Sequence, residues 1–146
     1  MRYWFALLAW ILVIFLFSTN SFSSAQTSKF FVPALKFAFP FLSPEQLQVG
    51  HIIFRKAGHV SEYFVLGFLA WRALRSANNH GIRLWLLSAG LVLLVALSDE
   101  FHQSFVPSRV SSIVDVGYDC VGGIAALVVL SRFRNETRTI YSHPVL

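Results

Sequence analysis

The stretch that decides the fold reads IRLWLLSAGLVLLVALSDEFHQ, residues 82–103. Its first 16 residues contain one charged side chain, Arg83, and a polar run then begins at Ser98. An apolar run of this length approaches the roughly 20 residues that an α-helix needs to cross a bilayer. We therefore predict a membrane-spanning helix over residues 82–97 that ends in a cluster of ionisable side chains.

Three other apolar stretches have a similar length and cover residues 3–20, 57–74 and 113–130. Between the first two, residues 29–55 are aromatic but interrupted by prolines, so we expect an amphipathic segment in the plane of the membrane interface. Ser43, Pro44 and Gln46 form a helix-start pattern within this segment. The chain is predicted to be an all-α integral membrane protein with one domain, residues 1–146. Its architecture would be a compact bundle of four short transmembrane helices, followed by a basic tail over residues 131–146.

The composition excludes an ordinary soluble domain. Hydrophobic residues make up 55% of the chain and charged residues 13%, whereas soluble domains carry roughly 25% charged residues. The net charge of +5 is expected to face anionic lipid head groups, and no nucleic-acid partner is expected. The single cysteine, Cys120, excludes an internal disulfide.

The distribution of basic residues predicts the orientation. With four spans, seven arginines fall on the side of both termini, and five basic residues fall on the side of the two polar connections. The side with the denser positive charge is expected to be cytoplasmic. We therefore predict a multi-pass protein of the cytoplasmic (inner) membrane with both termini inside. The first stretch, followed by Ser23-Ser24-Ala25, also resembles a signal peptide, but its many bulky aromatic residues favour retention.

Ionisable residues gather where three of the apolar stretches meet the outer boundary. Each such residue costs about 2.5–3.5 kcal/mol at membrane depth, so a cluster of them indicates function. His59, Glu62 and Tyr63 are spaced to share one helix face. The full set comprises Arg55, Lys56, His59, Glu62 and Tyr63, then Asp99, Glu100, His102 and Gln103, and finally Arg109, Asp115 and Asp119.

These residues also carry a resemblance to the VanZ-like membrane proteins, the family of the teicoplanin-resistance protein VanZ. The similar motifs are Phe17-Ser18, then Arg55-Lys56-Ala57-Gly58-His59 with Tyr63 and Leu66-Gly67, and then Asp99-Glu100-Phe101-His102-Gln103 followed by Phe105-Val106-Pro107, Arg109, Ser112, Asp115, Asp119 and Gly122. Asp119 departs from the pattern, because the family often carries an amide there. The resemblance implies an envelope-facing protein that alters the handling of a lipid-bearing molecule such as a lipoglycopeptide, without defining a reaction.

The residue types suggest two groups of roles. His59, Asp99, Glu100 and Asp115 are candidates for acid–base catalysis, since close carboxylates push each other's pKa values apart. Candidates for ligand binding are Arg55, Lys56, Arg109, Gln103, Tyr63 and Asp119, in which the basic groups would hold an anion. The alternative for each residue is an ion-pair and hydrogen-bond network that fixes helix packing.

The spacing of His59 and Glu62 could also place two ligands of a divalent metal on one face, but nearby basic residues oppose a cation, and we expect no cofactor. The expected partners are the lipid bilayer and an amphiphilic or lipid-linked ligand; the sequence identifies no protein partner. The predicted function is to bind or modify this molecule at the outer boundary, with an effect on susceptibility to teicoplanin-type antibiotics. A membrane hydrolase or transferase with Glu100 or His59 as base, and a non-catalytic subunit of an envelope machine, are the alternatives.

Overall fold

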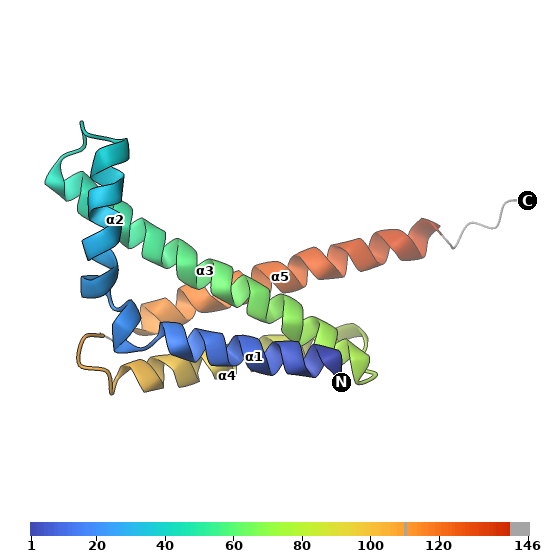
Figure 1. Ribbon diagram of the computed structural model, residues 1–146. Helices are drawn as coiled ribbons and strands as arrows, with labels where there is room; N and C mark the ends of the chain where they lie inside the picture. Colours follow the sequence, from blue (N-terminus) through green and yellow to red (C-terminus); the bar gives the residue numbers. More distant parts are fainter. Residues whose placement is uncertain (110, 141–146) are drawn as a thin grey trace, which may run out of the picture.

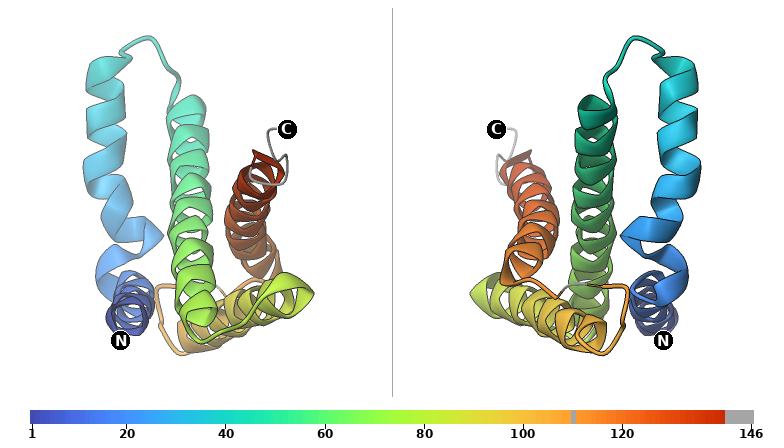
Figure 2. Two further views of the ribbon diagram at one scale, coloured as in Figure 1. Left: turned by 90° about the vertical axis from the view of Figure 1, so that its right-hand side faces the viewer. Right: turned by 90° about the vertical axis from the view of Figure 1, so that its left-hand side faces the viewer.

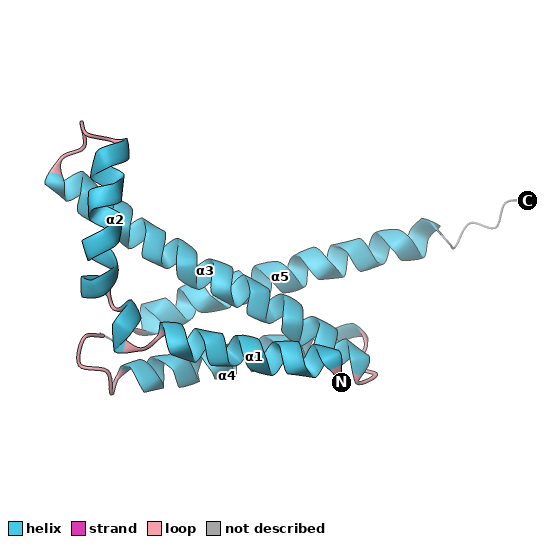
Figure 3. Cartoon of the chain, viewed as in Figure 1, coloured by secondary structure: helices cyan, strands magenta, loops and turns pink. Residues whose placement is uncertain are grey.

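The structure is a computed structural model that describes residues 1–109 and 111–140, with side chains described up to residue 133. Its elements are α1 (Arg2–Phe17), the 3₁₀-helix η1 (Asn20–Phe22), α2 (Ser24–Ala38), α3 (Pro44–Ser76), α4 (Gly81–Gln103) and α5 (Ile113–Ile140). Within these described ranges the chain is helical and contains no strand (Figure 3). The predicted all-α class is confirmed.

The longest helix, α3, joins two segments that the sequence suggested as separate units. It runs 33 residues from Pro44 to Ser76, through the end of the expected interfacial segment and the whole second apolar stretch. The predicted start is confirmed, because the Ser43 side chain accepts from the Gln46 amide and the Gln46 side chain accepts from the Ser43 amide. This reciprocal capping satisfies two amides that the first turn would otherwise leave unpaired.

The expected interfacial segment begins as a helix of its own. In α2, Pro33 lies inside the helix, and none of the residues of α2 is buried. A bend of 70° separates α1 from the η1–α2 segment. As Figure 1 shows, α2 therefore turns away from α1 and returns along the first half of α3.

Helix α3 is the centre of the fold, because it packs against α1, α2, α4 and α5. Figure 1 shows α3 and α5 crossing, and Figure 2 shows that α1 and α4, which overlap in Figure 1, diverge from each other, with α1 beside α3 and α4 passing below it. The main hydrophobic core lies at these crossings and includes Leu7 and Ile14 of α1, Tyr63 and Leu66 of α3, and Val92 of α4. Packing of apolar side chains around α3 thus brings the end of α1 and the α4–α5 connection close to the middle of α3.

Glycines allow the α3–α5 crossing to be close. A methyl group on Gly122 would overlap the carbonyl group of Val60, and one on Gly67 would lie 2.6 Å from the carbonyl oxygen of Gly123. Gly117 has open space where a side chain would be, so it does not contribute to this close approach. The small residues at the crossing therefore let the two backbones touch.

The prediction of four transmembrane helices is wrong as a count. Two helices are long and apolar enough to cross a membrane: α4, with a mean hydropathy of 2.0, and Ile113–Phe133 of α5, with 1.9. A third span exists if the bent pair of α1 and η1–α2 counts as one. Helix α1 alone has 16 residues, and α3 has the length but carries charged residues along its whole course, from Glu45 to Arg75. Residues 131–140 of the predicted tail continue α5, and residues 141–146 lie outside the described part of the chain.

Candidate functional site

A cavity of about 260 Å³ lies where the end of α1, η1, the start of α2, the middle of α3 and the connection from α4 to α5 meet; we call it the polar cavity because charged side chains stand among its apolar walls. The predicted site residues Arg55, His59 and Arg109 line it. Its other lining residues are Phe17, Ser18, Phe22, Thr27, Phe54, Gly58 and Glu62. Segments up to 92 residues apart in sequence therefore contribute to one site.

Arg109 closes this cavity from the α4–α5 connection. Its guanidinium donates to the carbonyl oxygens of Phe17, of Phe22 at 2.8 Å and of Thr19 at 3.4 Å. These carbonyls belong to the turn between α1 and α2, where the helical hydrogen-bond pattern is interrupted. Arg109 thus braces the bend while its charge faces the cavity.

The second guanidinium of the cavity belongs to Arg55, which donates to the Phe22 carbonyl at 3.2 Å. Among the side chains that the structure describes, no carboxylate oxygen lies within 4.0 Å of either arginine. Burial lowers the pKa of both guanidinium groups, and for Arg109 the positive charge of Arg55 lowers the pKa further. Arginine nevertheless stays protonated in proteins, so two positive charges face the cavity together with the Glu62 carboxylate, whose negative charge favours the protonated form of both arginines.

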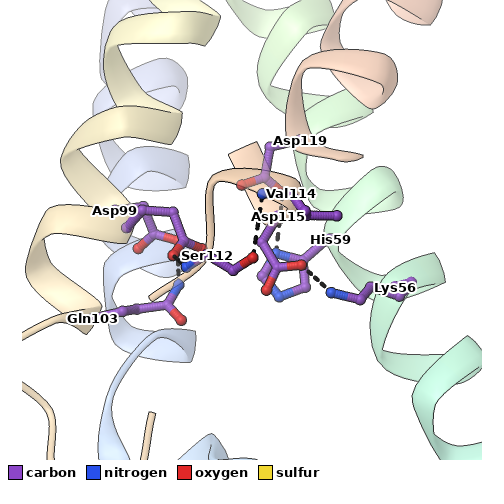
Figure 4. Close-up of polar contacts among 9 residues, drawn as sticks. Lys56, His59, Asp99, Gln103, Ser112, Val114, Asp115 and Asp119 are labelled. Carbon is purple, nitrogen blue, oxygen red and sulfur yellow. Dashed lines mark hydrogen bonds and ion pairs between the residues drawn. The ribbon is translucent and has the colours of Figure 1, made fainter. Parts of the chain in front are cut away.

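His59 forms the inner wall together with a carboxylate from α5. Its Nδ1 atom lies 3.0 Å from Oδ1 of Asp119, whose side chain is fully buried (Figure 4). A carboxylate partner holds the hydrogen on Nδ1 and leaves Nε2 as the atom available to a ligand. The arrangement orients an imidazole toward the cavity in the way that acid–base chemistry requires.

Glu62 is a wall residue that was not among the predicted catalytic or ligand-binding residues. Its carboxylate has no hydrogen-bond or ion-pair partner among the described side chains, and it lines the same cavity as the two arginines. Its spacing of three residues from His59 was the signal that could have identified it. Glu62 adds an acceptor to a site that is otherwise positive.

Lys56 and Asp115 form an ion pair between α3 and α5 (Figure 4). Their side chains are 33% and 17% exposed, and neither residue lines the cavity. The ammonium group of Lys56 also lies 5.0 Å from the centre of the Tyr118 ring. These contacts fit the alternative in which the pair fixes the packing of α3 on α5.

The predicted residues of α4 form a neighbouring buried network. Gln103 donates to Asp99 Oδ2 at 2.9 Å and to the Ser18 hydroxyl at 3.4 Å, which ties α4 to the end of α1. Glu100 Oε2 accepts from the Ser112 amide at 2.7 Å, which holds the α4–α5 connection. Asp99, Glu100 and Gln103 are buried and lie outside the cavity wall.

Tyr63 belongs to the hydrophobic core. Its side chain is fully buried, and its hydroxyl has no hydrogen-bond partner within the described residues. Of the ten predicted site residues, the structure therefore places Arg55, His59 and Arg109 on the cavity and Asp119 directly behind it. The other six lie in the adjoining networks or core: Lys56, Tyr63, Asp99, Glu100, Gln103 and Asp115.

The sequence suggested His59 and Glu62 as two possible ligands of a metal ion, and the described residues provide no third ligand beside them. Over the described residues, no group of three or more His, Cys, Asp or Glu side chains is placed to hold a metal ion. The closest imidazole–carboxylate contact of the cavity, His59 with Asp119, is a hydrogen-bonded pair between helices.

Comparisons with known proteins agree with the resemblance seen in the sequence. The sequence model of the VanZ/LLP1 family matches residues 3–134, which includes every residue of the cavity and its adjoining networks. Neither curated proteins nor solved structures give a match.

Proposed function

Because the chain belongs to the VanZ/LLP1 family, we propose that it is a cell-envelope membrane protein that binds an anionic amphiphilic or lipid-linked molecule in the polar cavity. The cavity would lie at the outer boundary of the cytoplasmic membrane, as the distribution of basic residues predicts. Binding there would change the susceptibility of the cell to teicoplanin-type antibiotics, as the family resemblance implies.

The observation that carries this proposal is the pair of arginines, Arg55 and Arg109, that face the cavity without a carboxylate partner among the described side chains. A half-buried positive charge is costly unless an anion balances it, and Glu62 is one carboxylate beside two arginines on the cavity wall. The forked guanidinium group suits phosphate and carboxylate, whose oxygens can accept two hydrogen bonds at once. An anionic head group is therefore the ligand chemistry that would best complete this cavity.

Glu62 restricts which anionic head groups would fit the cavity. A lone carboxylate repels an anion, so the part of the ligand that faces Glu62 should carry a hydrogen-bond donor such as a hydroxyl or an amine. A phosphate linked to a sugar, glycerol or amine satisfies both sides of the cavity.

A second candidate function is acid–base catalysis on the same bound molecule, as in a hydrolase or transferase. The His59–Asp119 contact of 3.0 Å favours it, because an oriented imidazole at the wall of an anion site can take a proton from a nucleophile. Catalytic roles for Asp99, Glu100 and Asp115 stay predictions, since none of the three lines the cavity and both Asp99 and Glu100 are buried.

Susceptibility to teicoplanin and vancomycin in a Gram-positive host tests the proposed function. Wild type, Arg55→Gln, Glu100→Gln and the control Arg75→Gln would be compared at equal abundance in the membrane. Arg75 is exposed at the opposite end of α3 and has no ion-pair partner in the described part of the chain. Arg55→Gln is preferred to Arg109→Ala, because loss of Arg109 would also release three backbone carbonyls.

We expect wild type and Arg75→Gln to protect selectively against teicoplanin and Arg55→Gln to lose protection. If Arg55→Gln protects as well as wild type, the anion site is not the functional site. Loss of protection in Glu100→Gln with ligand binding retained supports acid–base chemistry, whereas full protection removes Glu100 as the base. Protection by none of the variants, wild type included, contradicts the link to teicoplanin.

A further inference from the structure

A second cavity, of about 430 Å³, lies beside the polar cavity between η1, α2 and α3. Its walls are mainly phenylalanine side chains, from Phe22, Phe30, Phe31 and Phe54. Phe22, Thr27 and Phe54 line both cavities, so the apolar cavity begins where the polar one ends.

Contacts between α2 and α3 hold this apolar cavity in shape. The rings of Phe31 and Phe54 stack with their centres 4.3 Å apart. Thr27 Oγ1 lies 3.1 Å from Nε2 of His51, a buried residue of α3. These contacts fix the facing sides of the two helices without filling the space between them.

The apolar cavity is open toward the surroundings of the protein. Phe30 is 80% exposed and Phe54 is 53% exposed, although both line its wall. Exposed aromatic surface of this kind is unfavourable in water and favourable against hydrocarbon. At a membrane boundary, a hydrocarbon chain could enter sideways from the bilayer.

We propose that the apolar cavity between α2 and α3 holds the hydrocarbon chain of a single-chain anionic amphiphile whose phosphate or carboxylate head binds Arg55 and Arg109. This inference rests on the proposed function, and it adds the class of ligand and the place of its chain. Two observations select this occupant: the shared wall residues connect the two cavities, and the two arginines, which outnumber the one carboxylate on the cavity wall, lie at one end of the combined space. The combined space has the size and the polarity pattern of a ligand site, with an apolar wall and a few polar groups at one end.

The experiment uses the full chain in nanodiscs of phosphatidylcholine, with a dodecyl phosphate that carries a photoreactive diazirine at the end of its chain. After illumination, mass spectrometry locates the labelled peptides. Unlabelled dodecyl phosphate, butyl phosphate and inorganic phosphate then serve as competitors. The expected label lies on the peptides that contain Phe30, Phe31 and Phe54.

Two substitutions of small residues separate the chain site from the head site. Ser21→Trp places an indole in the apolar cavity, since Ser21 lines only that cavity. Ser24→Trp is the matched control, because Ser24 is exposed at the start of α2 and lines neither cavity. Gln26→Trp offers a second way to fill the apolar cavity if Ser21→Trp does not fold.

In wild type and in Ser24→Trp, dodecyl phosphate should compete at least about tenfold better than butyl phosphate, because burial of a few methylene groups suffices for that factor. In Ser21→Trp the advantage of dodecyl over butyl phosphate should be at least about tenfold smaller than in wild type, while competition by butyl phosphate stays unchanged. Comparing variants in identical nanodiscs cancels the greater partitioning of the longer chain into the bilayer.

The experiment distinguishes failure of the proposed chain site from failure of the proposed anion site. If the advantage of dodecyl over butyl phosphate is as large in Ser21→Trp and Gln26→Trp as in wild type, or if the label lies on α4 or α5, the chain site is wrong while the anion site stands. If Arg55→Gln leaves labelling and competition by butyl phosphate unchanged, the anion site and hence the proposed function fail as well.

Discussion

The Nδ1 atom of His59 on α3 lies 3.0 Å from a carboxylate oxygen of Asp119 on α5. This contact connects the wall of the polar cavity to the interface of α3 and α5, the most extensive helix–helix interface within the described residues. The pair has a structural and a chemical consequence. It ties the orientation of an imidazole on the cavity wall to the packing of two helices.

Substitutions at Asp119 should separate charge from hydrogen bonding. Asp119→Asn keeps an acceptor for His59, and we expect it to fold with a melting temperature close to that of wild type. Asp119→Ala leaves the imidazole without its partner and should cost about 1–3 kcal/mol of unfolding free energy. Thermal unfolding of the two variants in the same detergent measures the difference. Equal destabilisation would mean that the negative charge, and not the hydrogen bond, stabilises the fold.

Gly122→Ala should destabilise the α3–α5 crossing, because the added methyl group overlaps the carbonyl of Val60. Overpacking of this kind typically costs about 1–3 kcal/mol, since the helices must move apart. Gly117→Ala is the matched control on the same helix, and there the methyl group meets open space. We expect Gly117→Ala to be neutral or slightly stabilising. Equal unfolding temperatures for the two variants would contradict the close crossing.

The ion pair of Lys56 with Asp115 should contribute a modest coupling energy. Its side chains are partly exposed, so solvent screens the attraction, and exposed pairs give about 0.2–1 kcal/mol. A double-mutant cycle with Lys56→Met and Asp115→Asn, followed by chemical unfolding, measures the coupling. If the pair instead serves the ligand, either single substitution will weaken binding of butyl phosphate while leaving the unfolding curve unchanged.

Acid should loosen the contact between α2 and α3 through His51. Burial lowers the pKa of His51 below its usual value of 6.5, and the positive charge of Arg55 lowers the pKa further. The folded protein therefore binds the proton less readily than the undocked segment does, and stability rises with pH across the window between the two pKa values. As pH falls below 6.5, the docked arrangement of α2 should lose stability.

Hydrogen exchange of the α2 amides at pH 7.5 and pH 5.5, corrected for intrinsic rates, measures this effect. We expect faster corrected exchange at the lower pH in wild type and no pH difference in His51→Gln. The same pH difference in both proteins would assign it to another group.

Several features of the fold follow from local sequence because they depend on short-range physical chemistry. The capping pattern of Ser43, Pro44 and Gln46 determines where α3 begins, since its hydrogen bonds are made within four residues. The apolar runs at 82–97 and 113–130 predict two helices because burying their side chains away from water requires satisfied backbone groups. The clustering of Arg55, His59 and Arg109 was also predictable, because successive helices that cross a membrane in alternating directions bring their polar ends to the same boundary.

Tertiary structure decided the rest. The contact of Lys56 with Asp115 depends on how α3 is rotated against α5. That rotation is determined by close contacts at glycines from segments that are distant in sequence. Glu62 and Tyr63 are adjacent in sequence, yet one faces the cavity and the other lies in the core, because the packing of α3 against all four other helices selects which side is buried. The apolar cavity forms where the 70° bend after α1 returns α2 along α3, and Arg109, a residue 87 positions beyond Phe22, donates hydrogen bonds to three carbonyls at that bend. Local sequence determines the helices and their polar ends, whereas long-range packing determines which of those polar groups face a ligand.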